Sequence, residues 1–231
     1  MKIGGLQKVT LLDYPEKVAA IVFTSGCNFR CPFCYNPTLV LPELIAESQF
    51  IPPGELLAFL KKRKKYLDGV VISGGEPTLN PKLIPLLEKI KNLGYEIKLD
   101  TNGAYPEILQ TVIKRGLVDY LALDIKGPLE EYEKFCGVPI EVEKIKTSIK
   151  LVKNSSLPYE FRSTIVKGWH QQEDFEKMAQ AISGARLYYL QNFSPGVRLV
   201  KKDFSGRLFT PKELAELKIL AEKYVKKCLV R

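Results

Sequence analysis

Apolar runs rich in β-branched residues alternate with segments of helical periodicity along most of the chain, and this alternation limits the possible folds most strongly. Short apolar runs bounded by turn residues predict buried strands, and the longer stretches between them predict amphipathic helices. Strands are predicted over residues 18–24, 69–73, 95–100, 118–124, 159–166 and 186–193. Helices are predicted over residues 53–66, 81–93, 105–115, 129–135, 142–153, 172–182 and 211–226.

Strands that alternate with helices in this way predict a parallel sheet with right-handed crossovers. Six strand–helix units are too few for a closed eight-unit barrel. We therefore expect an α/β fold, a partial (β/α)₆ barrel that is open on one side, formed by a single domain over residues 1–231.

Composition and charge exclude several classes of protein. The 231 residues are 45% apolar and 26% charged, as in soluble globular domains. No apolar run approaches the roughly 20 residues that span a bilayer, and the N-terminal residues lack the features of a signal peptide, so we expect a cytoplasmic protein without a membrane partner. The net charge of +9 favours an anionic ligand. No recognition motif accompanies this charge, so we expect no nucleic-acid partner.

Chemically active residues gather where the predicted strands end. In parallel α/β folds the carboxyl ends of the strands carry the functional site. The residues at or near these ends are Cys27, Gly74, Gly75, Glu76, Asp100, Thr101, Asp124, Lys126, Arg162, Gln191 and Asn192. We expect this rim of the sheet to be the functional site.

Three of the five cysteines, Cys27, Cys31 and Cys34, form a C-x₃-C-x₂-C loop after the first predicted strand. Structural zinc usually takes four ligands, and only three are present locally, since His170 is the single histidine. Three thiolates suit a 4Fe–4S cluster in which one iron lacks a protein ligand. An open coordination position of this kind can bind and activate a small molecule.

This cysteine spacing resembles the signature of the radical S-adenosylmethionine superfamily. The GGEP segment that begins at Gly74 resembles the motif that holds the methionine amino group, where glycine lets backbone carbonyls approach the ligand. Phe33 matches the aromatic position beside the adenine. The resemblance implies that the three cysteines bind a 4Fe–4S cluster, whose free iron chelates S-adenosylmethionine. One electron from the reduced cluster then yields methionine and a 5′-deoxyadenosyl radical.

Two further segments resemble motifs of the glycyl-radical-enzyme activating enzymes. Asp124 and Lys126 belong to an LDIK segment, and the resemblance implies that they bind the amino and carboxylate groups of S-adenosylmethionine. Asp100 and Thr101 open a DTNG segment. The resemblance makes them candidates for a monovalent-cation site beside that carboxylate.

The chain resembles one group of these activases most closely, the anaerobic ribonucleoside-triphosphate reductase activating proteins. The similar segments are GLQK and LDYP near the N-terminus and the CYNP segment that contains Tyr35 and Asn36, which are candidates for binding the cofactor. Tyr35 stands where many relatives carry histidine. The resemblance implies two partners: an anaerobic ribonucleotide reductase, which is a glycyl radical enzyme, and an electron donor of the flavodoxin or ferredoxin type. No cysteine lies between Cys34 and Gly74, so no auxiliary cluster is expected.

Several alternatives stay open at this level. Arg162 could reach the ribose or carboxylate of the cofactor, or pair with an acid at the rim. Glu76 could contact the ligand or cap a helix, and Gln191 and Asn192 could bond the ligand. Packing roles are expected for Cys136, Cys228, Trp169 and His170, the last two at the surface.

Two rival functions are a radical enzyme that acts on a small molecule, such as a pterin or deazapurine precursor, and a non-catalytic zinc or iron–sulfur protein.

Overall fold

One sheet organises the chain in the computed structural model, which describes residues 1–194 and 198–231. Within these residues eight strands pair with their neighbours in chain order. The strands are β1 (Ile3–Thr10), β2 (Ala19–Thr24), β3 (Gly69–Gly74), β4 (Glu96–Thr101), β5 (Tyr120–Asp124), β6 (Tyr159–Ile165), β7 (Tyr188–Asn192) and β8 (Cys228–Val230). Strands β2 to β8 are parallel, and β1 is antiparallel to β2. No pairing of described residues joins β1 to β8, so the predicted open barrel is confirmed.

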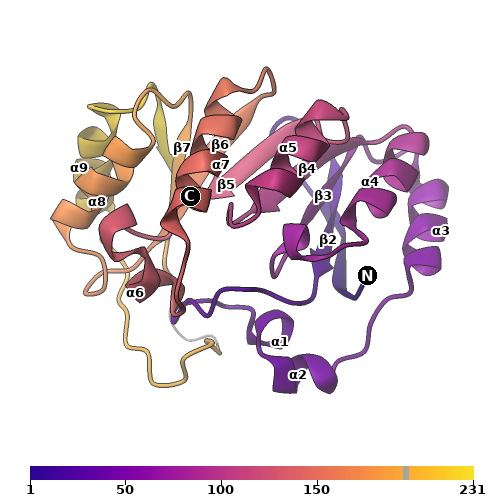
Figure 1. Cartoon of the computed structure of the whole chain (residues 1–231), viewed down its shortest axis with the longest axis horizontal. Coiled ribbons are helices and arrows are strands. Elements are labelled where there is room, and N and C mark those ends of the chain that lie inside the picture. The colour runs from indigo at the N-terminus through magenta and orange to yellow at the C-terminus, as the bar shows by residue number, and fades with distance from the viewer. Residues whose placement is uncertain (195–197) are drawn as a thin grey trace.

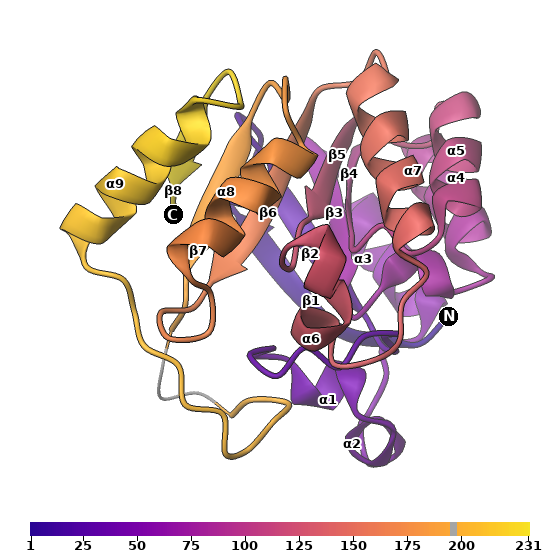
Figure 2. The ribbon, with the colours of Figure 1, turned by 60° about the vertical axis from the view of Figure 1, so that its left-hand side comes forward.

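Helices cover the outer face of the curved sheet, with α3, α4 and α5 over one half and α7, α8 and α9 over the other (Figure 1). The short helices α1, α2 and α6 lie beyond the carboxyl ends of the strands (Figure 2). The α-helices are α1 (Pro37–Val40), α2 (Pro42–Ala46), α3 (Pro53–Arg63), α4 (Leu83–Asn92), α5 (Pro106–Lys114), α6 (Tyr132–Cys136), α7 (Val142–Asn154), α8 (Gln172–Ala181) and α9 (Pro211–Glu222), and the 3₁₀ turns are η1 (Pro77–Leu79) and η2 (Leu129–Glu131). Across the described part of the chain, none of the helices has the length and apolar character that a bilayer crossing requires.

The structure differs from the sequence prediction mainly at the edges of the sheet and at helix ends. The six predicted strands correspond to β2–β7, whereas β1 and β8 were not predicted. Strand β1 buries fully only its first and last residues, so it lacks an apolar run, and β8 has only three residues. The helix predicted over residues 129–135 divides into η2 and α6, and Gly137, at a φ of 71°, ends α6 in the left-handed conformation.

The two faces of the sheet are filled differently. Between the outer face and the helices lies the main core, to which fully buried residues such as Leu87, Val112 and Ile145 belong. On the inner face, Tyr14 from the β1–β2 loop packs edge-on against Tyr120, with ring centroids 5.9 Å apart. This second cluster lies towards the amino ends of the strands and also contains Ile21. The carboxyl ends of the inner face are left to polar side chains.

Candidate active site

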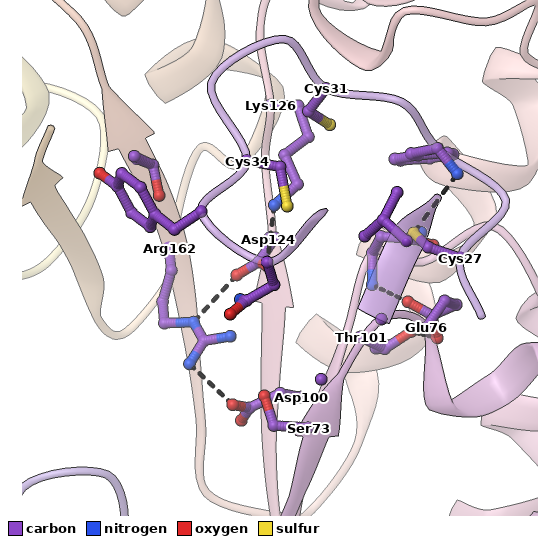
Figure 3. Close-up of a pocket in the computed structure, with 18 of the residues that line it drawn as sticks. Cys27, Cys31, Cys34, Ser73, Glu76, Asp100, Thr101, Asp124, Lys126 and Arg162 are labelled. Carbon is purple, nitrogen blue, oxygen red and sulfur yellow. Dashed lines mark hydrogen bonds and ion pairs between the residues drawn. The ribbon is translucent and has the colours of Figure 1, made fainter. Parts of the chain in front are cut away.

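A cavity opens at the carboxyl ends of the parallel strands, where the sequence predicts the site (Figure 3). It encloses about 850 Å³, including the part open to solvent. The cavity wall contains all the predicted site residues: Cys27, Cys31, Phe33, Cys34, Tyr35, Asn36, Gly74, Gly75, Glu76, Asp100, Thr101, Asp124, Lys126 and Arg162. Lining residues that were not predicted are Phe29, Val40, Ser73, Asn102 and Thr164.

The cysteine loop is held in place by contacts on its outer side. Nη1 of Arg30 donates to the carbonyl oxygens of Cys27 and Phe29, both at 2.7 Å. Its backbone N–H donates to the carbonyl of Cys136 in α6 at 2.7 Å. A segment between β7 and α9 also crosses the loop, because the N–H of Val200 donates to the carbonyl of Cys34 at 3.0 Å. These contacts fix the loop without using any of its thiols.

The three thiols of this loop are free and spread around the cavity wall. In Figure 3, Cys31 and Cys34 lie on one side and Cys27 lies on the other. Among the residues that the structure describes, no three His, Cys, Asp or Glu side chains lie close enough together to hold a single metal ion. In a 4Fe–4S cluster each cysteine binds a different iron, so the sulfurs need not converge on one point. Three thiols spread over one cavity wall therefore fit a 4Fe–4S cluster.

Gly74 and Gly75 allow the ends of β2 and β3 to approach each other closely. Gly74 has a φ of +111°, and a Cβ there would lie 2.4 Å from the backbone nitrogen of Thr24. A Cβ on Gly75 would lie 2.1 Å from the carbonyl oxygen of Gly26. The contact that excludes a side chain is thus with protein backbone. The sequence argument, which assigned the glycines to close approach of a ligand, missed this reason.

Replacing Gly75 by alanine is therefore expected to lower the free energy of unfolding. A Cβ forced against a backbone oxygen at 2.1 Å requires the two strand ends to shift, and overpacking of this kind costs about 1–3 kcal/mol. The matched control is Gly54→Ala in α3, where a Cβ meets nothing within 4 Å. We expect the control to be neutral or more stable by about 0.4–1 kcal/mol. Urea unfolding compares the two, and equal midpoints would contradict the close approach.

Glu76 joins the loop after β3 to the loop after β4. Its carboxylate is buried and accepts hydrogen bonds from the N–H of Thr78 at 3.0 Å, the hydroxyl of Thr101 at 2.7 Å and the N–H of Asn102 at 2.7 Å. Burial raises the pKa of Glu76, although these hydrogen bonds oppose the shift. Of the two roles that the sequence left open, the structure shows the capping role, because Glu76 bonds the first turn of η1.

Arg162 bridges two carboxylates on the inner face of the sheet. Its Nε lies 2.9 Å from Oδ1 of Asp124, and its Nη1 lies 3.0 Å from Oδ2 of Asp100 (Figure 3). Lys98 adds a contact of 2.9 Å to Asp100. Burial alone would raise the pKa of Asp124, but Arg162 and Lys126 lower it to about 2. Both acids are held as carboxylates, since the pKa of Asp100 is also lowered, by Arg162 and Lys98 against the effect of burial.

Lys126 is the second cation of the cavity wall, and its Nζ lies 3.0 Å from Oδ2 of Asp124. Burial alone would lower the pKa of Lys126, but Asp124 and the nearby thiols raise it. The backbone of Lys126 is held by His170, whose Nε2 donates to its carbonyl at 3.0 Å while Nδ1 accepts from the N–H of Val166. His170 is buried and stacks on Phe135, so the expectation of surface packing was wrong for this residue.

The three remaining predicted residues lie on the cysteine-loop side of the cavity. Phe33 is buried and packs edge-on against His170, with ring centroids 5.8 Å apart. The ring of Tyr35 stacks on Phe193, and its hydroxyl accepts from the N–H of Ser194 at 3.0 Å. Asn36 presents its N–H to the thiol of Cys34. These contacts order the wall of the cavity next to the thiols.

The structure also shows the contacts of other residues whose roles the sequence left open. The side chain of Asn192 makes two hydrogen bonds to the backbone of Phe209, so it is used in packing. Neither Gln191 nor Asn192 lines the described cavity. Cys228 is buried in β8, as expected, whereas the buried Cys136 lies within hydrogen-bonding reach of the Cys31 thiol. An open α/β barrel with three thiols, three carboxylates and two cations around one rim cavity is the arrangement of a barrel enzyme with a candidate cysteine-based metal centre.

Comparison with known proteins identifies this class more closely. Residues 21–182 match the Radical SAM superfamily. The chain is 34% identical to a candidate glycyl-radical enzyme activating enzyme of Methanocaldococcus jannaschii, over 99% of this chain and 95% of the relative. It is 30% identical to the pyruvate formate-lyase-activating enzyme of Clostridium pasteurianum, over 80% of this chain and 77% of the relative.

Solved structures share the fold. SuiB from Streptococcus suis matches with a TM-score of 0.68 and 15% identity, over 91% of this chain and 48% of that chain. QueE from Escherichia coli matches with a TM-score of 0.58 and 14% identity, over 100% of this chain and 93% of that chain.

The chain belongs to the Radical SAM superfamily, because the family match covers more than half of its length. It is a radical S-adenosylmethionine oxidoreductase with activating enzymes of glycyl radical enzymes among its relatives. The cofactors of the family are a 4Fe–4S cluster and S-adenosylmethionine. The resemblance inferred from the motifs is confirmed at this level.

Proposed function

We propose that this protein is an activase that installs a glycyl radical on a partner enzyme, an anaerobic ribonucleotide reductase. The observation that carries the proposal is the similarity to a candidate glycyl-radical enzyme activating enzyme over 99% of this chain and 95% of that relative. Similarity to a probable GTP 3′,8-cyclase of Saccharolobus solfataricus, which is named for a small-molecule reaction, covers only 58% of this chain and 44% of the relative. The extent of the match therefore supports a protein substrate.

Each group of cavity residues has a defined role in this proposal. Cys27, Cys31 and Cys34 would bind three irons of the cluster and leave the fourth iron to S-adenosylmethionine. When bound and reduced, the cluster supplies the electron that splits S-adenosylmethionine into methionine and a 5′-deoxyadenosyl radical. Asp124 accepts hydrogen bonds from the amino group of the ligand, and Lys126 pairs with its carboxylate.

Other lining residues shape the pocket around the nucleoside. Phe33 precedes Cys34 in the cavity wall, where its ring would pack against the adenine. Gly74 and Gly75 bring the end of β3 close to Gly26 at the start of the cysteine loop, where they would hold the methionine amino group. Tyr35 and Asn36 close the wall beside Cys34.

The open barrel suits a reaction on another protein. Transfer of a hydrogen atom from a glycine Cα to the 5′ carbon gives 5′-deoxyadenosine and leaves one unpaired electron on the glycine. The reacting Cα must come close to the 5′ carbon, so a loop of the partner has to enter the cavity. The cavity opens to solvent at the carboxyl ends of the strands, which gives such a loop access. A flavodoxin or ferredoxin supplies the electron in the cell.

Replacing Asp124 by asparagine is expected to weaken binding of S-adenosylmethionine by about 10- to 100-fold, since hydrogen bonds to charged groups contribute about 1.5–3 kcal/mol. The iron content should stay unchanged, because Asp124 contacts Lys126 and Arg162 and no cysteine. Equilibrium dialysis on the reconstituted protein measures the affinity, and iron analysis measures the iron content. Glu216→Gln, at an exposed position of α9, is the control. Unchanged affinity in the Asp124 variant would remove this residue from the site.

Electron paramagnetic resonance tests the proposed function directly. The reconstituted protein, S-adenosylmethionine and dithionite are incubated under anoxia with an anaerobic ribonucleotide reductase that carries glycine deuterated at Cα. The expected results are a glycyl radical on the partner and deuterium in the 5′-deoxyadenosine. A partner whose reacting glycine is replaced by alanine is the control. Cleavage of S-adenosylmethionine without a partner radical would contradict an activase of this partner, and a colourless protein holding one zinc would contradict an enzyme.

A further inference from the structure

The sequence resemblance makes Asp100 and Thr101 candidates for a monovalent-cation site, and Asp124 is the second carboxylate beside Asp100 on the inner face of the sheet. In the structure a side chain of the protein lies between them. The guanidinium of Arg162 contacts Asp124 through Nε at 2.9 Å and Asp100 through Nη1 at 3.0 Å. An inorganic cation that bridged the same two acids would have to displace this guanidinium. The residues present therefore do not fit a bound monovalent cation.

The other oxygen atom implied for that cation is also engaged. The hydroxyl of Thr101 donates to Glu76 at 2.7 Å and accepts from the N–H of Gly103 at 3.1 Å. Ligating a cation would compete with the hydrogen bond from Gly103 and move the hydroxyl from a buried position. The hydroxyl of Thr101 thus joins the loop after β4 to the loop after β3.

The charges around the pair also leave no need for an added cation. Within the described residues, the connected network contains the cations Lys98, Lys126, Arg162 and Arg231 and the carboxylates Asp100, Asp124 and Glu160. The cations outnumber the carboxylates by one.

The guanidinium can also contact a ligand. Nε and one Nη1 proton are used on the two acids, and Nη2 has no hydrogen bond to any residue that the structure describes. Figure 3 shows this third nitrogen turned into the cavity, beside Asp124. Arginine offers several N–H donors in one plane, so it can bridge two protein acids and still donate to a third carboxylate.

We propose that Arg162 replaces the inorganic monovalent cation: its guanidinium joins Asp100 to Asp124 and donates through Nη2 to the carboxylate of S-adenosylmethionine. Binding of S-adenosylmethionine by this protein is consequently independent of potassium and sodium. The inference rests on the S-adenosylmethionine site of the proposed function, and it does not depend on the identity of the protein partner.

Isothermal titration of the cluster-loaded protein with S-adenosylmethionine tests the inference. It is done in potassium, sodium or choline chloride at equal ionic strength, and the wild-type affinity should change less than about twofold. Arg162→Ala opens a gap between the two acids. We expect its affinity to fall about tenfold or more in choline chloride, as for loss of a charge-assisted hydrogen bond, and to recover in potassium chloride. Arg162→Lys retains a cation and should remain insensitive to potassium.

Thallium(I), a heavy stand-in for potassium, gives a second readout in crystals. Anomalous scattering should show no thallium between Asp100 and Asp124 in the wild type and a peak there in Arg162→Ala. Arg115→Gln, which removes an exposed ion pair with Glu88, is the control for a general loss of positive charge. A wild-type affinity that depends on potassium, or a thallium peak in the wild type, overturns the inference. The inference is also overturned if potassium does not restore the affinity of an iron-loaded Arg162→Ala variant for S-adenosylmethionine. Should that variant fail to take up iron, the inference is tested by the affinities of the wild type and Arg162→Lys in the three salts. None of these measurements requires a partner, so failure of the glycyl radical assay leaves this test intact.

Discussion

Replacement of any one of Cys27, Cys31 and Cys34 by alanine is expected to reduce cleavage of S-adenosylmethionine to background. Each thiol would bind a different iron, so a variant with two thiols leaves a second iron without a protein ligand. Anaerobic reconstitution followed by iron and sulfide analysis measures the cluster. An absorbance shoulder that dithionite bleaches reports its redox activity, and chromatography of 5′-deoxyadenosine reports cleavage.

The two other cysteines provide matched controls for this experiment. Cys228 is buried in β8 and does not line the cavity, so Cys228→Ala should retain cluster and cleavage. Cys136 contacts the Cys31 thiol but is absent from the cavity wall, and Cys136→Ala should also retain both. A Cys136→Ala variant that lost its cluster, together with a Cys31→Ala variant that kept one, would show that the ligands were wrongly assigned.

The rim of the barrel could be predicted because one rule of topology orders it. Parallel strands present their carboxyl ends on one edge, so Gly74, Asp100 and Asp124 could be placed together before any contact was known. The register agrees with this expectation, since Asp124 of β5 pairs with Arg162 of β6. The rule places residues on an edge but does not state their contacts. It could not decide whether Arg162 faces the ligand or an acid, and the structure shows it paired with two acids.

The features that were missed depend on contacts between distant segments. His170 is enclosed by Phe33, Phe135 and Phe175, which come from three separate parts of the chain. A histidine in a short loop after glycine gives no local signal of such burial. Lys98 was missed for a related reason, because an alternating strand pattern identifies two faces but does not show whether the polar face meets solvent or the inside of a barrel.

That inner position makes Lys98 a residue whose replacement should destabilise the fold strongly. Its side chain is 0% exposed, and its Nζ lies 2.9 Å from Asp100 and 3.3 Å from Glu160. Lys98→Met retains most of the aliphatic chain and removes the charge that compensates two buried carboxylates. Breaking a buried ion pair by removing one partner costs about 3–5 kcal/mol, so we expect a loss of that size in the free energy of unfolding. Urea unfolding under anoxia, at equal iron content, measures it.

Two comparisons separate the lost charge from a general effect of substitution. Lys17→Met removes a partly exposed ion pair with Glu96, and surface pairs of this kind contribute at most about 1 kcal/mol. Adding Glu160→Gln to Lys98→Met removes one of the two carboxylates that lose a cation partner, so the double variant should be more stable than Lys98→Met alone. If Lys98→Met cost no more than Lys17→Met, the remaining cations of the network, Arg162 on Asp100 and Arg231 on Glu160, would be sufficient to stabilise the two carboxylates.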